Sequence, residues 1–255
     1  MQTYLSFIEY LCDLQYIVKT GIDLMKLFLL IIFIQAPINA FGSLKLEYLS
    51  SGSTYNYFSI PPSSGNRIDL PDTTKNGAIR VFYEKGYKDW SWTLLYAPLE
   101  LEYSFTSRKT FTFNNSNFSS NTATTVKYKF NSYRLGYRRI KRFNNSRLYY
   151  GGLLKIRDAK ICVAQSSLTD CYDNIGPVPL LNFGFDLSND AYFLGANVDG
   201  LFSSKGSAYD INIEAGKIFN SFKVALGTRR LGGGAENETV LNFAAFQSYY
   251  FSIIF

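Results

Sequence analysis

The charged residues of this chain are arranged for electrostatic pairing rather than for proton transfer. The 255 residues include no histidine, which removes the most common general base and the usual partner of a catalytic nucleophile. Glu100 and Glu102 are two residues apart and project from the same face of a strand, yet no local pattern indicates paired-carboxylate or Ser–Lys chemistry. No metal-ligand cluster, P-loop or dinucleotide fingerprint is present. We therefore predict no enzymatic activity, no metal site and no cofactor.

Charged residues alternate with apolar residues in several stretches, and we expect them to line the interior of one structure. Rows of opposite sign on neighbouring strands can pair across the strands. The expected interior network consists of Glu100, Glu102, Arg134, Arg138, Lys155, Arg157, Asp186, Asp199, Asp210, Glu214 and Arg229. We read this network as a structural plug in which Arg134 and Glu100 help to occlude the interior. The alternative is a narrow polar path for ions or a small solute.

The elements that would position these charges are strands with one apolar face. In the stretch 209–216, Tyr209, Ile211 and Ile213 alternate with Asp210 and Asn212, and the stretch 181–187 repeats the pattern. A strand in a membrane shows apolar residues to lipid and polar residues to the interior. Every backbone N–H and C=O group in hydrocarbon needs an internal partner, so spanning strands must close into a barrel. A Lys or Arg at the lipid midplane costs about 2–4 kcal/mol, which requires the charged rows to face inward.

Turn residues divide the chain into ten expected strands, with eight as the alternative count. Gaps between them are alternately long and short, which is typical of outer-membrane barrels with long outer loops and tight periplasmic turns. The expected strands are 43–58, 78–87, 90–106, 126–140, 147–163, 177–188, 191–203, 207–219, 222–230 and 239–255. A barrel this small is filled by side chains, whereas open porins need 16–18 strands. A wide general porin is therefore not expected.

The N-terminal region is expected to direct export rather than to fold. Residues 25–42 begin with Met-Lys, continue with an apolar run too short to span a bilayer as a helix, and end with small residues. This pattern predicts a signal peptide. Residues 1–24 are interpreted as an upstream extension outside the fold, and 43–255 as the barrel. An exported chain meets an oxidising compartment, so a disulfide between Cys162 and Cys171 is expected to brace a long loop.

The last strand carries the most specific signal. Tyr249, Phe251, Ile253 and Phe255 occupy alternate positions at its end. This ending resembles the C-terminal signature of bacterial outer-membrane barrel proteins, and the mature chain resembles small OmpA- or OmpW-like barrels in style. The resemblance implies an up-and-down barrel in the outer membrane, recognised by the barrel-assembly machinery during insertion and surrounded by outer-membrane lipid and lipopolysaccharide. Omptin proteases and lipid A deacylases are similar in size, but both families need a histidine.

These observations predict an all-β, closed, antiparallel, transmembrane up-and-down barrel of about ten strands in a bacterial outer membrane. The main functional expectation is a non-enzymatic protein, structural or passing small solutes through a charged lumen. The alternative is a surface adhesin or receptor acting through the loops 59–77, 107–125 and 164–176. A lipid-acting enzyme is the third reading, and a soluble lipocalin-like barrel is the alternative fold. The net charge of +6 has no basic face or run that would indicate nucleic acid.

Overall fold

The computed structural model describes residues 42–63, 67–71, 76–204 and 206–255, and they form β-structure. The strands are β1 (Gly42–Ser59), β2 (Ile68–Leu70), β3 (Asn76–Gly86), β4 (Trp90–Ala97), β5 (Glu100–Thr106), β6 (Phe111–Phe113), β7 (Ser116–Phe118), β8 (Ala123–Arg142), β9 (Ser146–Gln165), β10 (Leu168–Ser188), β11 (Tyr192–Ser203), β12 (Gly206–Ile218), β13 (Lys223–Glu236) and β14 (Leu241–Ile254). The expected extension 1–24 and nearly all of the expected signal peptide lie outside the described residues. Within the described ranges no helix is long and apolar enough to cross a bilayer.

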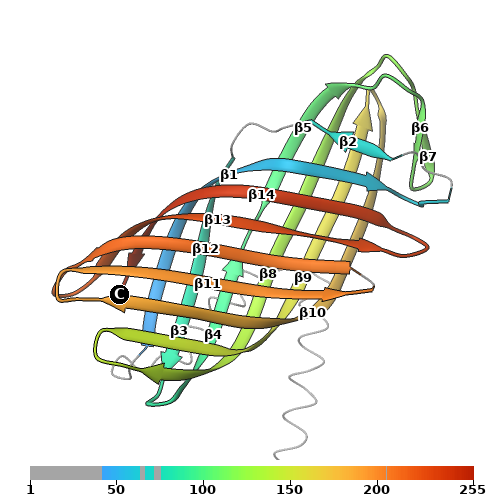
Figure 1. Cartoon of the computed structure of the whole chain (residues 1–255). Coiled ribbons are helices and arrows are strands. Elements are labelled where there is room, and N and C mark those ends of the chain that lie inside the picture. The colour runs from blue at the N-terminus through green and yellow to red at the C-terminus, as the bar shows by residue number, and fades with distance from the viewer. Residues whose placement is uncertain (1–41, 64–66, 72–75, 205) are drawn as a thin grey trace, which may run out of the picture. The chain divides into compact units, whose positions relative to one another are not determined.

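The main sheet closes on itself. Its order is β14-β13-β12-β11-β10-β9-β8-β4-β3-β1, and β1 also pairs with β14 (Figure 1). The closing pair is antiparallel and long, running from Lys45 opposite Ile254 to Ser59 opposite Leu241. The last strand, β14, is therefore paired on both sides, with β13 and with β1. This double pairing explains why the barrel ends in an ordered apolar strand. The predicted closed antiparallel barrel of about ten strands is confirmed, with β4 and β5 counted as one interrupted strand.

The interruption between β4 and β5 is repaired by a neighbouring side chain. Both strands pair with β8, but Pro98 between them has no N–H to donate. The backbone N–H of Leu99 bonds to Asn131 Oδ1 at 3.0 Å, and the N–H of Phe130 bonds to the carbonyl of Leu99 at 2.7 Å. The break therefore leaves the two backbone groups of Leu99 satisfied.

We call the part of the barrel near the short turns its lower part. The outer face of this part is apolar. The expected outward rows on 181–187 and 209–215 do face outward. Large exposed apolar residues in this band include Tyr48, Ile79, Leu135, Leu154, Leu181, Phe183, Phe185, Leu194, Ile211, Ile213, Leu226, Tyr249 and Phe251. A contiguous band of this kind is typical of a surface that contacts lipid.

The polarity of the strands inverts in the upper part. Along β8, Arg134 is buried while Leu135 is 49% exposed; higher on the same strand, Val126 and Tyr128 are buried while Lys127 is exposed. The alternation continues in phase, so the same inward face changes from charged to apolar. We call the upper region the exposed lobe: β5, β6, β7 and residues 123–131, 157–165 and 168–180. Figure 1 shows β5, β8 and β9 rising beyond the ends of β11 and β12.

The inside of the exposed lobe is an apolar core. The small β6–β7 hairpin contributes three of its most buried side chains, Phe111, Phe113 and Phe118, each no more than 2% exposed. They belong to one cluster with Phe58, Ile60, Leu70, Leu99, Leu101, Tyr103, Val126, Tyr128, Ile161, Val163, Val240, Ala244 and Phe246. Aromatic side chains bury large areas, so this core closes the long-strand end of the barrel.

All three expected long loops contain strand residues, and the stretch 59–77 includes the short strand β2. The stretch 164–176 is the tip of a β-hairpin, in which β9 and β10 pair without a break down to Leu168 opposite Gln165. The stretch 107–125 contains the β6–β7 hairpin. These strands were missed because polar residues and a Gly-Pro pair on β10 are typical of loops, although here they lie on strands above the apolar band.

Candidate functional site

The interior of the lower barrel holds a large buried ion cluster. Six strands contribute to it, because alternate side chains of each strand point into the barrel. We call it the central cluster, made of Lys45, Glu47, Arg80, Arg134, Asp199, Asp210, Glu214 and Arg229. Four cations balance four carboxylates. The charges are therefore neutralised within the protein, as buried charges must be.

Asp210 and Glu47 are the centres of this cluster. Asp210 lies 2.8 Å from Arg134 Nη2, 2.8 Å from Arg229 Nη1 and 3.7 Å from Arg80 Nη2. Glu47 lies 3.1 Å from both Arg80 and Arg229. Arg134 also reaches Asp199 Oδ2 at 2.6 Å. Each arginine therefore connects two or more strands across the lumen.

A second group of charges lies closer to the short turns. We call it the mouth cluster: Glu84, Arg138, Arg147 and Asp186. Arg147 lies 2.7 Å from Asp186 Oδ2 and 3.2 Å from Glu84 Oε2, and Arg138 lies 3.3 Å from Glu84. Ser91 donates to Glu84 at 2.7 Å. The Arg138 guanidinium lies over the ring of Tyr149, 4.3 Å from its centroid, a favourable cation–π contact.

The two clusters line a cavity of about 510 Å³. Its inner end is formed by central-cluster side chains such as Arg134 and Asp199. Its outer end is formed by the β8–β9 turn, including Arg142 and Asn145, and by Lys223 at the start of β13. The cavity thus runs from the middle of the barrel to the short-turn end. The apolar core described above lies on the other side of the central cluster.

The structure brings together most, but not all, of the charges expected in the lumen. Five expected residues belong to the central cluster, namely Arg134, Asp199, Asp210, Glu214 and Arg229, and two belong to the mouth cluster, Arg138 and Asp186. Lys155 is 2% exposed, lies 4.5 Å from the ring centroid of Phe130, and forms no ion pair with any described residue. Arg157 donates to Asn174 Oδ1 at 2.6 Å, higher in the lobe.

The expectation for Glu100 and Glu102 is wrong. Both side chains are exposed, and Glu102 lies 3.8 Å from Lys127, which is also exposed. Their neighbours Leu101 and Tyr103 alternate with these carboxylates, so the same prediction would turn them to lipid; they are instead 3% and 1% exposed and lie in the lobe core. The reason is the polarity inversion: on β5 the outside is polar, so the carboxylates face outward. Arg134 is consequently paired with Asp199 and Asp210 rather than with Glu100.

Sequence reasoning missed five charged residues of the two clusters. They are Lys45 and Glu47 on β1, Arg80 and Glu84 on β3, and Arg147 on β9. The sequence pattern that predicts inward-facing charges was present on β1. Lys45 and Glu47 alternate there with Leu44, Leu46 and Tyr48, in the same way as the charged residues that were recognised.

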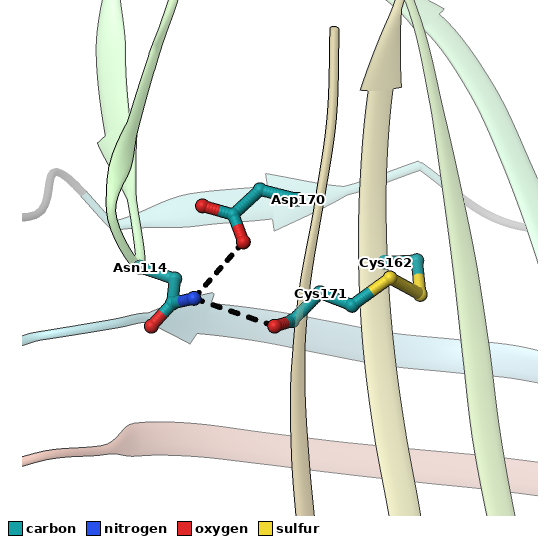
Figure 2. The surroundings of a disulfide bond; sticks show 4 residues. All are labelled: Asn114, Cys162, Asp170 and Cys171. Atoms are coloured by element: carbon teal, nitrogen blue, oxygen red, sulfur yellow. Dashed lines mark hydrogen bonds between the residues drawn. A yellow bond between two sulfur atoms is a disulfide. The ribbon is translucent and has the colours of Figure 1, made fainter.

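A disulfide joins Cys162 and Cys171 near the tip of the β9–β10 hairpin (Figure 2). The two residues are direct partners across the strands. They lie in the exposed lobe, on a hairpin rather than on either side of a long loop. The disulfide therefore links strands that are already paired.

The β6–β7 hairpin is tied to the same tip by polar contacts. Asn114 at its turn donates to Asp170 Oδ1 at 2.9 Å and to the carbonyl of Cys171 at 3.3 Å (Figure 2), and the N–H of Asn115 donates to Asp170 Oδ2 at 3.0 Å. Burial opposes ionisation of Asp170, but these hydrogen bonds hold its pKa below the usual 3.8. The ionised carboxylate therefore fastens the hairpin to the lobe.

Comparison with known proteins gives likeness of fold alone. No protein-family model matches the chain. No curated protein matches it either. Among solved structures, it is similar to the outer-membrane protease OmpT of Escherichia coli, with 10% identity, a TM-score of 0.48, and coverage of 84% of this chain and 95% of that one.

Two further structures are similar to this chain. The transport unit of the autotransporter AIDA-I of Escherichia coli has 8% identity and a TM-score of 0.45, covering 86% of this chain and 91% of the other. Ail, the attachment invasion locus protein of Yersinia pestis, has 10% identity and a TM-score of 0.37, covering 84% and 99%. These structures are an outer-membrane protease, the transport unit of an autotransporter and an attachment invasion protein, so their functions differ from one another.

Proposed function

We propose that this chain is a non-enzymatic barrel of the bacterial outer membrane, closed to solute flow, which works through its exposed lobe. The observation that carries the proposal is the inversion of strand polarity. The lower outer face suits lipid, while the lobe has the apolar interior and polar exterior of a water-exposed protein. A lobe of this kind has no role in lining a pore. It presents a folded surface on the side of the longer connections.

The closed lumen argues against free passage of solutes. A hydrated ion that crossed the barrel would have to separate the paired charges around Asp210 and then enter the lobe core around Phe113. Both steps are unfavourable, because an ion loses its hydration in an apolar core and breaking a buried ion pair leaves an uncompensated charge. We infer surface interaction, the reading of an adhesin or receptor, as the function that fits this geometry.

The outer face fits the expected surroundings of such a protein. Tyr249 and Phe251 on the last strand and Phe255 directly after it are between 43% and 58% exposed, with Ile253 half-buried between them. We propose that the barrel-assembly machinery reads this row during insertion, and that it afterwards contacts outer-membrane lipid. Lipopolysaccharide would surround the outward side chains where the apolar band meets the lobe.

Two measurements on the full chain test the proposal together. Planar-bilayer recordings are expected to show no step conductance for the wild-type protein. Cells that display the chain are expected to gain adhesion to neighbouring cells or to a coated surface, and to lose it when β9 and β10 are shortened to a turn after Asp158 and before Ile175. A heat-modifiability shift on a detergent gel shows that the shortened barrel still folds. Steady conductance of the wild type, or adhesion that survives the shortening, would contradict the proposal.

Passage of small solutes is the second candidate, and the cavity favours it. A charged space of about 510 Å³ already occupies the lower half of the lumen. Passage would then require the β6–β7 hairpin and the lobe core to move. If this candidate function is correct, the same bilayer recordings would show voltage- or ligand-dependent openings instead of no conductance.

A further inference from the structure

The mouth of the cavity carries more positive than negative charge. Inside, the central cluster is neutral, and the mouth cluster pairs two cations with two carboxylates. Arg142 and Lys223 also line the outer end, and neither forms an ion pair with a described residue. Arg142 instead donates to the backbone carbonyls of Tyr87 and Lys88. These two cations are therefore uncompensated at the entrance.

The surrounding rim extends the same field. With Arg142 and Lys223 included, six exposed cations lie at the short-turn end of the described chain, against two exposed carboxylate side chains there, Asp89 and Asp190. The cations are Lys88, Arg139, Lys141, Arg142, Lys217 and Lys223. A cleft with walls of low dielectric focuses such a field and raises the local concentration of anions.

The cavity also offers hydrogen-bond donors that the protein does not use. Arg138 is 6% exposed and lines the cavity, yet its only ion pair within the described part of the chain is the 3.3 Å contact with Glu84, and its Nε has no hydrogen-bond partner there. Asn144 and Asn145 add side-chain amides to the wall, whereas the amide of Asn182, which also lines the cavity, already donates to Asn197 and Asp199. Guanidinium and amide donors are the groups that bind phosphate and carboxylate oxygens.

We propose that this cavity is a binding site for an oxyanion that enters from the short-turn side. A volume of about 510 Å³ lies within the range of about 300–1,000 Å³ usual for small-molecule sites. Phosphate is the chemistry that the arginines favour, either free in the periplasm or carried by the headgroup of an inner-leaflet lipid. The site is independent of the exposed lobe, so it can exist whether or not the lobe binds a partner.

Calorimetric titration of the full chain in a non-ionic detergent tests the proposal. The probes are pyrophosphate, as a free phosphate, and glycerophosphoglycerol, as a soluble lipid headgroup; trehalose is the neutral probe of similar size. At low salt, saturable binding of at least one phosphate probe is expected and trehalose is expected not to bind. Tighter binding of glycerophosphoglycerol assigns the site to a lipid headgroup, and tighter binding of pyrophosphate assigns it to a free phosphate.

Variants separate the cavity from general attraction to a basic protein. The double variant Arg142→Gln, Lys223→Gln is expected to weaken phosphate binding by about tenfold or more, since two nearby unit charges are lost. Lys223→Gln alone removes one charge without disturbing the Arg142 contacts. The matched control, Lys109→Gln with Lys127→Gln, removes two exposed lysines, one between β5 and β6 and one on β8 in the exposed lobe, and is expected to change binding less than twofold. Absence of saturable phosphate binding, equal binding of trehalose, or equal losses in the two double variants would overturn the proposal.

Discussion

At the scale of single residues, Asp210 holds the interior together. It is 1% exposed and contacts three arginines from three other strands. Removing one partner of a buried ion pair leaves uncompensated charge, which typically costs about 3–5 kcal/mol. Asp210→Asn, which keeps the size of the side chain, is therefore expected to lower the free energy of unfolding by about that amount in urea titrations of the micelle-embedded barrel.

The exposed pair of Glu102 and Lys127 provides the control for Asp210. Its charges are 3.8 Å apart and more than half exposed, so their interaction is worth about 0–1 kcal/mol. Glu102→Gln is expected to leave the unfolding midpoint nearly unchanged. A loss for Glu102→Gln as large as that for Asp210→Asn would show that both carboxylates are buried, contrary to the position of Glu102 on the outside of the lobe.

Asp170 gives the lobe a dependence on pH. Its pKa is lowered by the Asn114 and Asn115 hydrogen bonds against the effect of burial, so its contribution to stability is present above the ordinary pKa of 3.8 and is lost as the pH falls through the lower folded-state value. Hydrogen exchange of the β6–β7 amides, corrected for intrinsic rates, is expected to be constant from neutral pH to about 5 and to rise below 3.8. Asp170→Asn is expected to give faster exchange without this acid transition; a transition that persists in Asp170→Asn would assign it to another group.

At the scale of elements, the disulfide stabilises the hairpin tip rather than the barrel. Cys162 and Cys171 are nine residues apart, and closing a loop of this size is worth at most about 2–3 kcal/mol. Cys162→Ser with Cys171→Ser is expected to speed amide exchange between residues 163 and 170 and in β6–β7, while the heat-modifiability shift stays. Loss of that shift would mean that the disulfide is needed for the barrel itself.

The upper half of β10 is an open sheet edge that prolines protect. Only residues 181–188 of β10 pair with β11, so residues 168–180 pair with β9 alone. The carbonyl of Cys171 points away from β9 and accepts from Asn114. Residues at every second position from Cys171, including Pro177 and Pro179, therefore turn their backbone groups to the free edge. Proline has no N–H there, which discourages pairing with another chain.

Restoring these donors tests the role of the edge. Pro177→Val with Pro179→Val adds two N–H groups to a strand whose outer face already exposes Ile175, 61% accessible. The double variant is expected to self-associate in detergent more than the wild type, as measured by analytical ultracentrifugation. An unchanged, monodisperse profile would show that something other than proline protects the edge.

The sequence predicted side-chain orientation correctly on strands whose whole outer face is apolar, because there the rule that apolar residues face outward and charged residues inward holds along the entire strand. On β12, lipid lies outside and the lumen inside, so the alternation of Ile211 and Ile213 with Asp210 and Glu214 gave the orientation correctly. On β5 and the upper parts of β9 and β10 the outside is water, and the same rule placed Glu100 and Glu102 inside. The sequence alone does not state where along a strand the surroundings change, because that depends on how far neighbouring strands extend.

At the scale of the whole molecule, three layers follow one another along the barrel. A charged cavity faces the short turns, a neutral ion cluster lies at mid-barrel, and an apolar core fills the lobe. In each layer the interior is formed by the inward-facing, alternate residues of the strands. The outer face is apolar around the lower two layers and polar around the lobe. The closed lumen, the proposed surface function and the proposed oxyanion site all depend on this order.

The most direct measurement of this order is the collision rate of nitroxide labels in lipid vesicles. Labels at Phe183 and Leu226, on the apolar band, are expected to collide more with oxygen, which concentrates in lipid, than with a water-soluble nickel chelate. Labels at Glu102 and Lys127 are expected to show the opposite preference, and a label at Val126 to be shielded from both. Lipid-like exposure at Lys127, or chelate access at Phe183, would contradict the inversion of polarity on which the account depends.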